Sequence, residues 1–334
     1  MNQYISKTLT SFAMAFAALA AHGQDEGPLM KNTQPLCIGR YLVDIPVDSE
    51  PWGKSFNYVG NKFTVNLATA DEAEKAYEKK RSELMSPKSD NYIHKEVKLK
   101  SGGIIAVRPK DYQGFHGEEI GFDIFGYAWE GKQYIVKHGA SVDKLDRAFS
   151  SVQRVLNNMR RLKPKEVPSD HGFCITGAFI PGPPQEVDQY EYAYMSFRPR
   201  SNPDVLITIS TETHYKKEEK SLLERKPSAG LLSLFSGDLW RIKHLRSGKR
   251  NVKDMPGEEV MDAIKTDNGG ISHVARWETE GQLGTATHPM IVVELETAAK
   301  AGQVEYANSS LNNEQAMALF DAVVNSVRLR PISQ

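Results

Sequence analysis

One short phrase occurs twice in the sequence, and this repetition constrains the fold more than any other feature. "PLCIGRYLVDIP" runs from Pro35 to Pro46, and "HGFCITGAFIP" runs from His171 to Pro181. Each copy holds one of the chain's two cysteines, followed by Ile, a glycine, apolar residues and a closing proline. A phrase repeated this far apart in the chain predicts that one structural unit is used twice.

Shorter matches follow the two cysteines in the same order along the chain. They pair the ranges 99–103 with 245–249, 117–120 with 257–260, 129–132 with 277–281, and 149–164 with 320–331. Solenoid repeats have units of about 20–50 residues, and these copies are longer. We therefore expect a domain duplication rather than a solenoid.

Chain length agrees with two domains. A chain of 334 residues is too long for one ordinary hydrophobic core. The junction at 161–172 contains two prolines and mixed charges, which are typical of a short, stiff linker. We expect a signal segment at 1–23, an N-terminal domain at 24–166 and a C-terminal domain at 167–334.

The N-terminus predicts export from the cytoplasm. Lys7 supplies a positive charge, and the apolar run 9–21 is shorter than the roughly 20 residues that a membrane-spanning helix needs. Small residues follow at a spacing typical of cleavage, so we expect a secretory signal peptide and a mature, periplasmic protein beginning near Gln24. The absence of a cysteine at the cleavage point argues against a lipid anchor.

A strand hairpin opens each copy after its cysteine phrase. In the first copy, the alternation of Phe63, Val65 and Leu67 predicts a hairpin about a Gly60-Asn61 turn. The second copy shows the same pattern in 190–213, where one strand face is formed by Val205, Ile207 and Ile209.

Helices and further strands complete each copy. A charged helix is expected after each hairpin, at 71–85 and from Lys216 to about Phe235. The expected later strands are 121–131, 133–139, 270–281 and 288–297. A closing amphipathic helix is indicated by Val142, Leu145, Phe149, Val152, Leu156 and Met159, and by Ala316, Leu319, Phe320, Val323 and Val327. The predicted fold class is α+β, with two similar domains from an internal duplication, each an antiparallel sheet with flanking helices.

Charge balance argues against nucleic-acid binding. Lys and Arg together number 42, as do Asp and Glu, so the formal net charge is zero. Binding of phosphate backbones through bulk charge needs a basic surplus.

Motifs for catalysis are weak. Ser272 lies in "GGISH", which lacks the closing Gly of a nucleophile elbow, and Ser141 begins "SVDK", where we expect a helix cap. His138, His214 and His273 are expected at the surface or at strand edges, and metal-binding motifs and Gly-rich phosphate loops are absent from the sequence. We predict no enzymatic activity, no cofactor and no metal site.

Two acidic pairs recur in the two copies, Glu118-Glu119 and Glu258-Glu259. Paired carboxylates can perform acid–base chemistry. Duplication copies structural residues as readily as functional ones, so we interpret these pairs as solvated strand ends.

An apolar run precedes a basic run in the second copy. "AGLLSLFSGDLW" (229–240) is either buried between the two copies or exposed as a recognition loop. "RIKHLRSGKR" (241–250) is either a solvated loop or a contact for an acidic protein or lipid headgroups.

The two cysteine phrases resemble those of a known family. Cys37, Gly39, Arg40, Asp44 and Pro46 carry the resemblance in the first copy, and Gly172, Phe173, Cys174 and Pro181 carry it in the second. They look like the two-domain immunity proteins that protect bacteria from type VI secretion lipase effectors. The resemblance implies a periplasmic protein that is not an enzyme and that binds and silences a cognate phospholipase-type toxin.

This resemblance fits an exported chain without a catalytic motif, since two lobes can form a cleft that grips a partner. Other classes remain open at this point, namely an envelope hydrolase with an unrecognised site and a periplasmic module that carries a lipid or ligand. A neighbouring gene for a lipase with a Gly-x-Ser-x-Gly elbow would favour immunity. We expect no nucleic-acid partner and no stable membrane insertion.

Two sets of residues follow as site predictions. The contact with the toxin is predicted at Phe235, Trp240 and Arg241, whose alternative role is packing between lobes. Cys37 and Cys174 either form a disulfide, which oxidising surroundings permit, or remain two buried thiols. The sequence does not choose between covering the toxin's active site and holding its lid shut.

Overall fold

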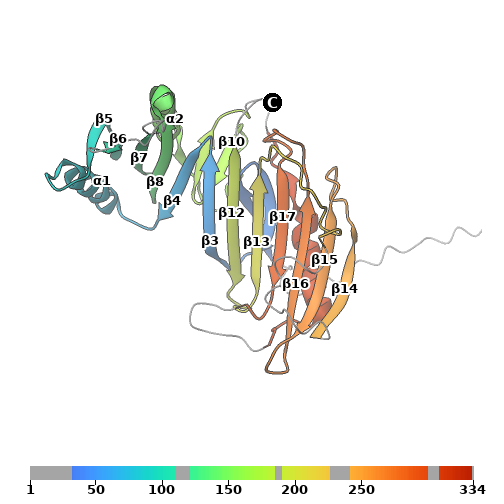
Figure 1. Ribbon diagram of the computed structural model, residues 1–334. Coiled ribbons are helices and arrows are strands. Elements are labelled where there is room, and N and C mark those ends of the chain that lie inside the picture. The colour runs from blue at the N-terminus through green and yellow to red at the C-terminus, as the bar shows by residue number, and fades with distance from the viewer. Residues whose placement is uncertain (1–31, 110–120, 185–189, 226–240, 300–307, 333–334) are drawn as a thin grey trace, which may run out of the picture.

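The computed structural model describes residues 32–109, 121–184, 190–225, 241–299 and 308–332. Within these ranges the chain is mainly antiparallel β-sheet with three α-helices (Figure 1). Strands of the first half are β3 (Ser49–Tyr58), β4 (Asn61–Asn66), β5 (Asn91–Leu99), β6 (Gly102–Pro109), β7 (Gly121–Trp129) and β8 (Gln133–Ser141). Strands of the second half are β12 (Glu191–Pro199), β13 (Leu206–Glu212), β14 (Ile242–Lys249), β15 (Glu258–Lys265), β16 (Ile271–Thr279) and β17 (Met290–Glu296).

These twelve strands form one continuous sheet rather than one sheet per domain. Their order is β14-β15-β16-β17-β13-β12-β3-β4-β8-β7-β6-β5. The seam is the antiparallel pair of β3 with β12, in which Tyr58 faces Glu191 and Ser49 faces Pro199. The expectation of two separate sheets is therefore wrong, because the first strands of the two hairpins pair with each other across the domain boundary.

Two small sheets interlock the halves behind the large one. One contains β1 (Thr33–Ile38), β2 (Tyr41–Pro46) and β18 (Arg328–Leu329), and the other contains β10 (Gly172–Ile175), β11 (Ala178–Pro181) and β9 (Arg160–Arg161). The last strand of each half thus pairs with the cysteine hairpin of the other half. Each half completes a sheet of its partner.

The three helices take their positions from local sequence signals. α1 (Ala70–Met85) starts at a capping box of Thr69 and Glu72, and α3 (Asn313–Ser326) starts at one formed by Asn312 and Gln315. α2 (Leu145–Asn158) follows a short 3₁₀ turn and buries one apolar stripe on the sheet.

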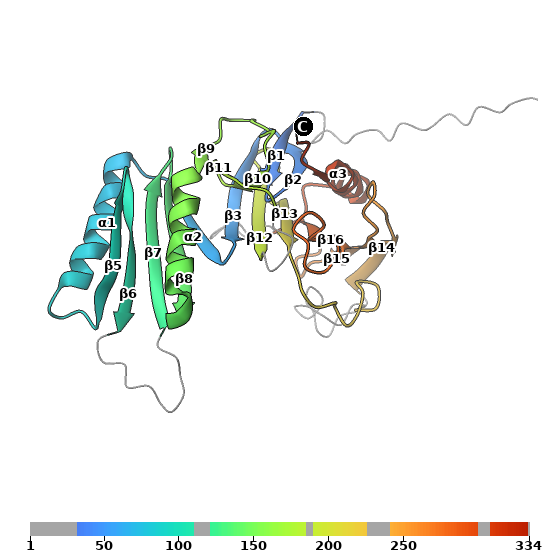
Figure 2. The same ribbon diagram turned by 90° about the horizontal axis from the view of Figure 1, so that it is seen from above.

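α1 and α2 lie on opposite faces of the first-half strands (Figure 2). A Cβ on Gly103 would lie 2.4 Å from the Tyr77 ring of α1, whereas one on Gly126 would lie 2.6 Å from Leu156 of α2. Gly103 is paired with Tyr127, the neighbour of Gly126, and adjacent strand residues point to opposite faces. α2 and α3 share one face of the large sheet, and their buried side chains join one hydrophobic core that spans both halves.

Several local predictions differ from the structure. No helix forms in 216–225, and the rest of the helix predicted from Lys216 to Phe235 lies outside the described residues. Val59 and Gly60, both with positive φ, form the first hairpin turn, so it begins one residue earlier than predicted. Leu67 is 83% exposed, because β4 ends at Asn66 and the chain leaves the sheet there.

Candidate protein-binding surface

Of the three predicted contact residues, Phe235 and Trp240 lie outside the described residues. Arg241 directly precedes β14, and its guanidinium contacts the carboxylate of Asp267. The structure therefore places Arg241 at the outer edge of the large sheet.

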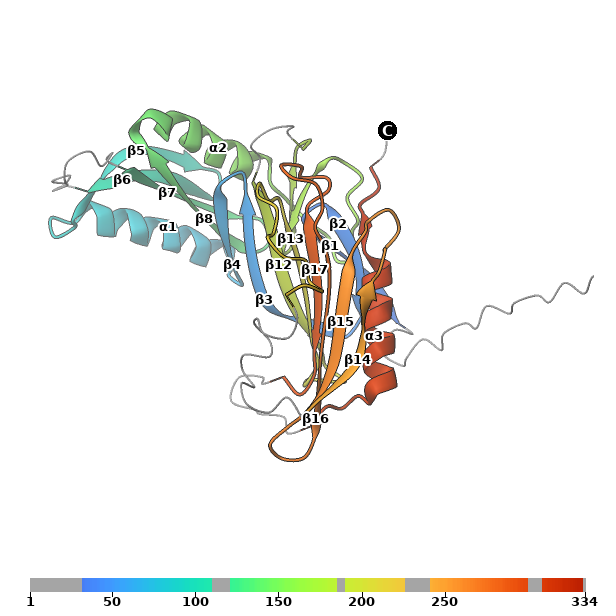
Figure 3. The same ribbon diagram turned by 45° about the vertical axis from the view of Figure 1, so that its right-hand side comes forward.

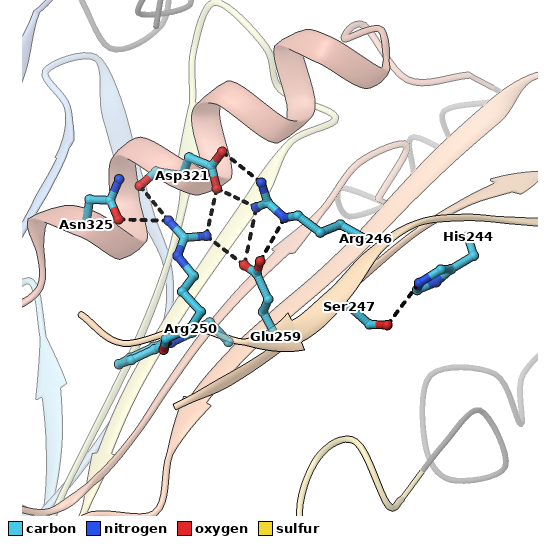
Figure 4. Close-up of polar contacts among 8 residues, drawn as sticks. His244, Arg246, Ser247, Arg250, Glu259, Asp321 and Asn325 are labelled. Atoms are coloured by element: carbon cyan, nitrogen blue, oxygen red, sulfur yellow. Dashed lines mark hydrogen bonds and ion pairs between the residues drawn. The ribbon is translucent and has the colours of Figure 1, made fainter. Parts of the chain in front are cut away.

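The basic run that follows is a strand, not a loop. β14 pairs with β15 along its length and forms one edge of the large sheet. Arg246 and Arg250 from this run turn toward α3 (Figure 4). The expected solvated loop is thus wrong, because these arginines have carboxylate partners inside the fold.

Those partners form a compact ion-pair network. Arg246 Nε lies 2.8 Å from Glu259, and Arg250 Nη1 lies 2.7 Å from both Glu259 and Asp321. Arg250 also donates to Asn325 at 2.8 Å, and Arg246 contacts Asp321. Hydrogen bonding to Asp321 raises the pKa of Arg246 above its ordinary value. The network joins the sheet edge to α3, so it has a structural role.

Both edge strands of the large sheet have features that disfavour pairing with an added strand. β5 has a bulge between Ile93 and Lys95, and β14 has one between His244 and Arg246. Bulges and charged side chains on edge strands disfavour pairing with another chain. A strand-addition site for a partner is therefore not favoured at either edge.

The two cysteines meet where the two halves cross. Cys37 and Cys174 are joined by a disulfide with Cα atoms 5.7 Å apart, and Gly39 and Cys174 exchange backbone hydrogen bonds. Beside them Arg40 forms a buried, two-pronged pair with Glu191, with Nε 2.7 Å from a carboxylate oxygen. These covalent and ionic contacts link the first half to the second.

The catalytic candidates have structural hydrogen bonds. Ser272 Oγ donates to the carbonyl of Thr297 at 2.7 Å. Ser141 Oγ donates to the Asp143 carboxylate at 2.5 Å and does not cap the following turn, contrary to our expectation. In the described part of the chain neither hydroxyl is hydrogen-bonded to a histidine, so a Ser–His pair for acyl transfer is not formed there.

The histidines differ from the prediction of surface positions. His273 is fully buried, with Nδ1 3.0 Å from Thr297 Oγ1 and Nε2 2.9 Å from Asn313 Oδ1, and burial lowers its pKa. His138 is half-buried with Nδ1 2.9 Å from Asn61, and burial lowers its pKa as well. His214 is also half-buried.

Glu258 and Glu259 have separate structural partners. Glu258 accepts from the backbone N–H of Leu223 at 2.9 Å, while Glu259 belongs to the network with α3. Glu118 and Glu119 lie outside the described residues. Among the described residues no cluster of three or more His, Cys, Asp or Glu could hold a metal ion.

Two open pockets flank the cysteine hairpins. One of about 560 Å³ lies between Tyr41, Leu222, Met255 and His288, and the other of about 500 Å³ lies between Leu36, Lys132, Lys165 and Phe197. Each is bordered by the tip of a long hairpin, Gly281 in the first and Gly131 in the second. Their mixed charges do not converge on a reacting centre.

Comparison with known families gives matches over nearly the whole described chain. The N-terminal domain of Tle cognate immunity protein 4 matches residues 34–162. The C-terminal domain of the same family matches residues 166–332. The chain belongs to the Tle cognate immunity protein 4 family.

Solved structures share the fold of this member of the Tle cognate immunity protein 4 family. The apo immunity protein TplEi of the T6SS from Pseudomonas aeruginosa is 23% identical with a TM-score of 0.70, covering 90% of this chain and 98% of that one. TplEi with an "L" peptide is 20% identical with a TM-score of 0.68, covering 90% and 99%. A chain of the Tle4–Tli4 complex is 23% identical with a TM-score of 0.70, covering 90% and 99%.

No curated protein matches the chain. Within the described ranges, none of the helices has the length and apolar character required to cross a bilayer. Sequence reasoning missed β5, β14 and β15, whose mixed polar patterns resemble loops, and it missed β6, whose apolar run 104–107 was the available signal. It also missed the aromatic residues at the seam, which the hairpin prediction treated as strand formers.

Proposed function

We propose that this chain is a periplasmic immunity protein that binds a cognate type VI secretion lipase effector and inhibits it, protecting the producing cell and its kin. The observation that carries the proposal is the match of both domains of the Tle cognate immunity protein 4 family. The similar structures, an immunity protein of the T6SS and a Tle4–Tli4 complex, support it.

Inhibition by binding, without catalysis, fits the geometry of the candidate residues. Ser272, Ser141 and His273 are engaged in hydrogen bonds within the fold. A lipase must expose an apolar active-site surface to lipid, so a protein can inhibit it by covering that surface or by holding its lid shut.

The two-domain division at 24–166 and 167–334 is part of this proposal, as is the origin of the domains by duplication. Two observations support duplication: the large sheet has the same strand order outward from the seam in both halves, and both edge strands carry a bulge. One sequence match does not support it. Glu258–Val260 begins β15, the counterpart of β6, whereas 117–120 directly precedes β7.

Export to the periplasm is supported by the N-terminal sequence, with a charged start and the apolar run 9–21. The Cys37–Cys174 disulfide is compatible with that oxidising compartment. A lipase effector delivered to the envelope would meet the protein there.

Phe235, Trp240 and Arg241 remain proposed contacts with the effector. Each would be replaced by Ala, thermal unfolding would be compared with that of the wild type, and affinity would then be measured. If the folded variants bind like the wild type, this segment does not contact the effector.

We expect a neighbouring gene to encode the cognate lipase, with a Gly-x-Ser-x-Gly elbow, and this adjacent-gene lipase together with the mature protein tests the function. Increasing amounts of the protein are added to a fixed amount of lipase acting on phospholipid vesicles. We expect hydrolysis to stop at a one-to-one ratio, and the protein alone to hydrolyse neither ester nor phospholipid. Hydrolysis by the protein alone that disappears in the Ser272→Ala variant would support the hydrolase alternative, and unchanged lipase activity at excess protein would contradict the proposal.

A further inference from the structure

One face of the large sheet carries little helical cover. α2 and α3 lie on the core face, and α1 covers only first-half strands on the other (Figure 3). We call the outward side of β3, β12, β13, β17 and β16 on that second face the open face. Among the described residues, no helix packs on these five strands from that side.

Three alternate tyrosines line the centre of the open face. Tyr190, Tyr192 and Tyr194 are half-buried, while Ala193 and Met195 between and beyond them belong to the core. Tyr190 donates to Glu212 at 2.8 Å. Tyrosines held by neighbouring groups lose little conformational entropy when a partner packs on them.

Glycine allows one of these rings to lie across the seam. A Cβ on Gly53 of β3 would lie 3.2 Å from Cε1 and 3.5 Å from the hydroxyl of Tyr194, which belongs to β12. The Tyr194 ring therefore contacts the strand of the first half. A partner that packs on this ring touches both halves of the protein.

Trp52 forms a second aromatic group beside this row. It is the extra residue at the irregularity where β3 pairs with Ser196 and Phe197, and it is 54% exposed. The Arg198 guanidinium lies 4.7 Å from the centre of its ring. Arg198 is itself buried and donates to the carbonyls of Pro203 at 2.7 Å and Ala299 at 3.1 Å. The exposed indole of Trp52 thus packs against a guanidinium whose position is held by hydrogen bonds.

Charge on the open face is predominantly negative away from the aromatic row. The carboxylates on this side of β13, β16 and β17 are Glu212, Glu278, Glu294 and Glu296, by alternation with core residues in the strand pairings. Arg276 pairs with Glu278 at 2.7 Å and with Glu294 at 2.6 Å. Two further guanidiniums lie on this side: Arg225 contacts Glu278, and Arg198 lies against Trp52, which leaves Glu212 and Glu296 outside these ion pairs. This excess of carboxylates complements a basic partner.

We infer that the effector docks on the open face, with Trp52, Tyr192 and Tyr194 as anchors and with a cationic segment of the effector facing Glu212, Glu294 and Glu296. Trp, Tyr and Arg dominate binding energy at protein interfaces when they lie near the centre of the contact. The inference rests on the proposed function and adds the surface and the charge of the partner to it.

The area is consistent with part of such an interface. Five strands at about 4.8 Å spacing and seven residues at about 3.3 Å give roughly 550 Å². A standard interface buries about 800 Å² on each partner. We therefore expect the contact to extend past the strands, for example onto Tyr215, which is 49% exposed.

The test measures affinity for the adjacent-gene lipase with the full mature protein. Trp52→Ala and Tyr192→Ala are each expected to weaken binding about 30-fold, as for interface hot spots. Glu296→Lys is expected to weaken it about 10-fold and to reduce its salt dependence. The matched control is Tyr92→Ala, on the edge strand β5 and 37% exposed, which should bind like the wild type.

A further variant helps to separate a loss of binding from a loss of folding. Ser210→Arg places a bulky cation beside Tyr194 on the open face and should abolish binding, with thermal unfolding of the variant measured beside its affinity. If the wild type does not bind the lipase, the proposed function fails. If the wild type binds and the folded open-face variants bind within threefold of it, this inference is overturned while the function stands. A change in the oligomeric mass of the free protein at unchanged lipase affinity would also overturn it, because the face would then bind a second copy.

Discussion

The two halves of the large sheet differ most on the face opposite their shared core. In the first half, α1 packs Tyr77 against Gly103 on that face. In the second half, the chain after β13 begins with "KKEEKS" and forms no helix in 216–225. α1 buries Ala73, Tyr77 and Leu84 as an apolar stripe, which a run of consecutive charges cannot supply. The comparison shows how one strand order can carry a helix on this face in one half and, in the described part of the other half, only the non-helical segment 216–225, through Leu223 and Arg225.

The same comparison holds at the sheet edges. In the first half, Lys95 of β5 lies 2.7 Å from Asp146 of α2, and both side chains are exposed. In the second half, Arg246 and Arg250 meet Asp321 of α3 in a half-buried network. Both halves thus connect the edge strand to the closing helix, and removal of one partner should cost more in the second connection because it leaves a buried charge uncompensated.

Separating the halves should have the largest effect. Each half provides a strand to the other's small sheet, and one core spans both, so neither 32–165 nor 166–332 should unfold cooperatively alone. Urea unfolding followed by circular dichroism would check this. A half with a sharp transition like that of the whole chain would show that the halves are independent domains.

Removal of the disulfide should have the next largest effect. The bond closes a separation of 137 residues, and it restricts the unfolded chain, so Cys37→Ser with Cys174→Ser should lower the free energy of unfolding by about 2–4 kcal/mol. Denaturant titration of the double variant against the oxidised wild type gives the difference. Equal midpoints would mean that the crossing is held by other contacts, with the buried Arg40–Glu191 pair the first to test.

The difference between the ion pairs at the two sheet edges predicts unequal losses of unfolding free energy for equivalent substitutions. Asp321→Ala removes one of the two carboxylates that Arg246 and Arg250 share in a half-buried position, Glu259 being the other, and it should cost about 2 kcal/mol of unfolding free energy. Asp146→Ala removes an exposed pair and serves as the control, with no measurable change expected. Similar losses in the two variants would contradict the difference between the edges.

Acid should lower the free energy of unfolding of the chain through His273, which is buried in β16. Burial lowers its folded-state pKa, so the unfolded state binds the proton first, and stability falls as pH drops below about 6.5. The loss is at most about 1.4 kcal/mol per pH unit for this group. Unfolding free energies at pH 7.5 and 5.5 should differ less in His273→Gln than in the wild type, with His138 supplying a remaining dependence. An identical pH difference in both proteins would exclude His273 as a cause.

Sequence alone predicted the antiparallel class, the hairpins, α1, α2 and α3, because apolar periodicity and turn residues are local signals. It did not predict the joined sheet, since the pairing of β3 with β12 is decided by packing between segments far apart in the chain. The surface row of Tyr190, Tyr192 and Tyr194 was not predicted, for a related reason. Alternating Tyr residues are typical of any strand, and only the sheet order shows that no helix covers these in the described part of the fold.

We propose that the protein binds a lipase effector with both halves at once. Hydroxyl-radical footprinting of the free protein and of its complex with the adjacent-gene lipase measures this directly, since aromatic side chains react according to their exposure. We predict that Trp52 of the first half and Tyr192 of the second both lose reactivity in the complex, while Tyr92 at the far edge does not. Protection confined to one half, in a complex that fully inhibits the lipase, would contradict the account.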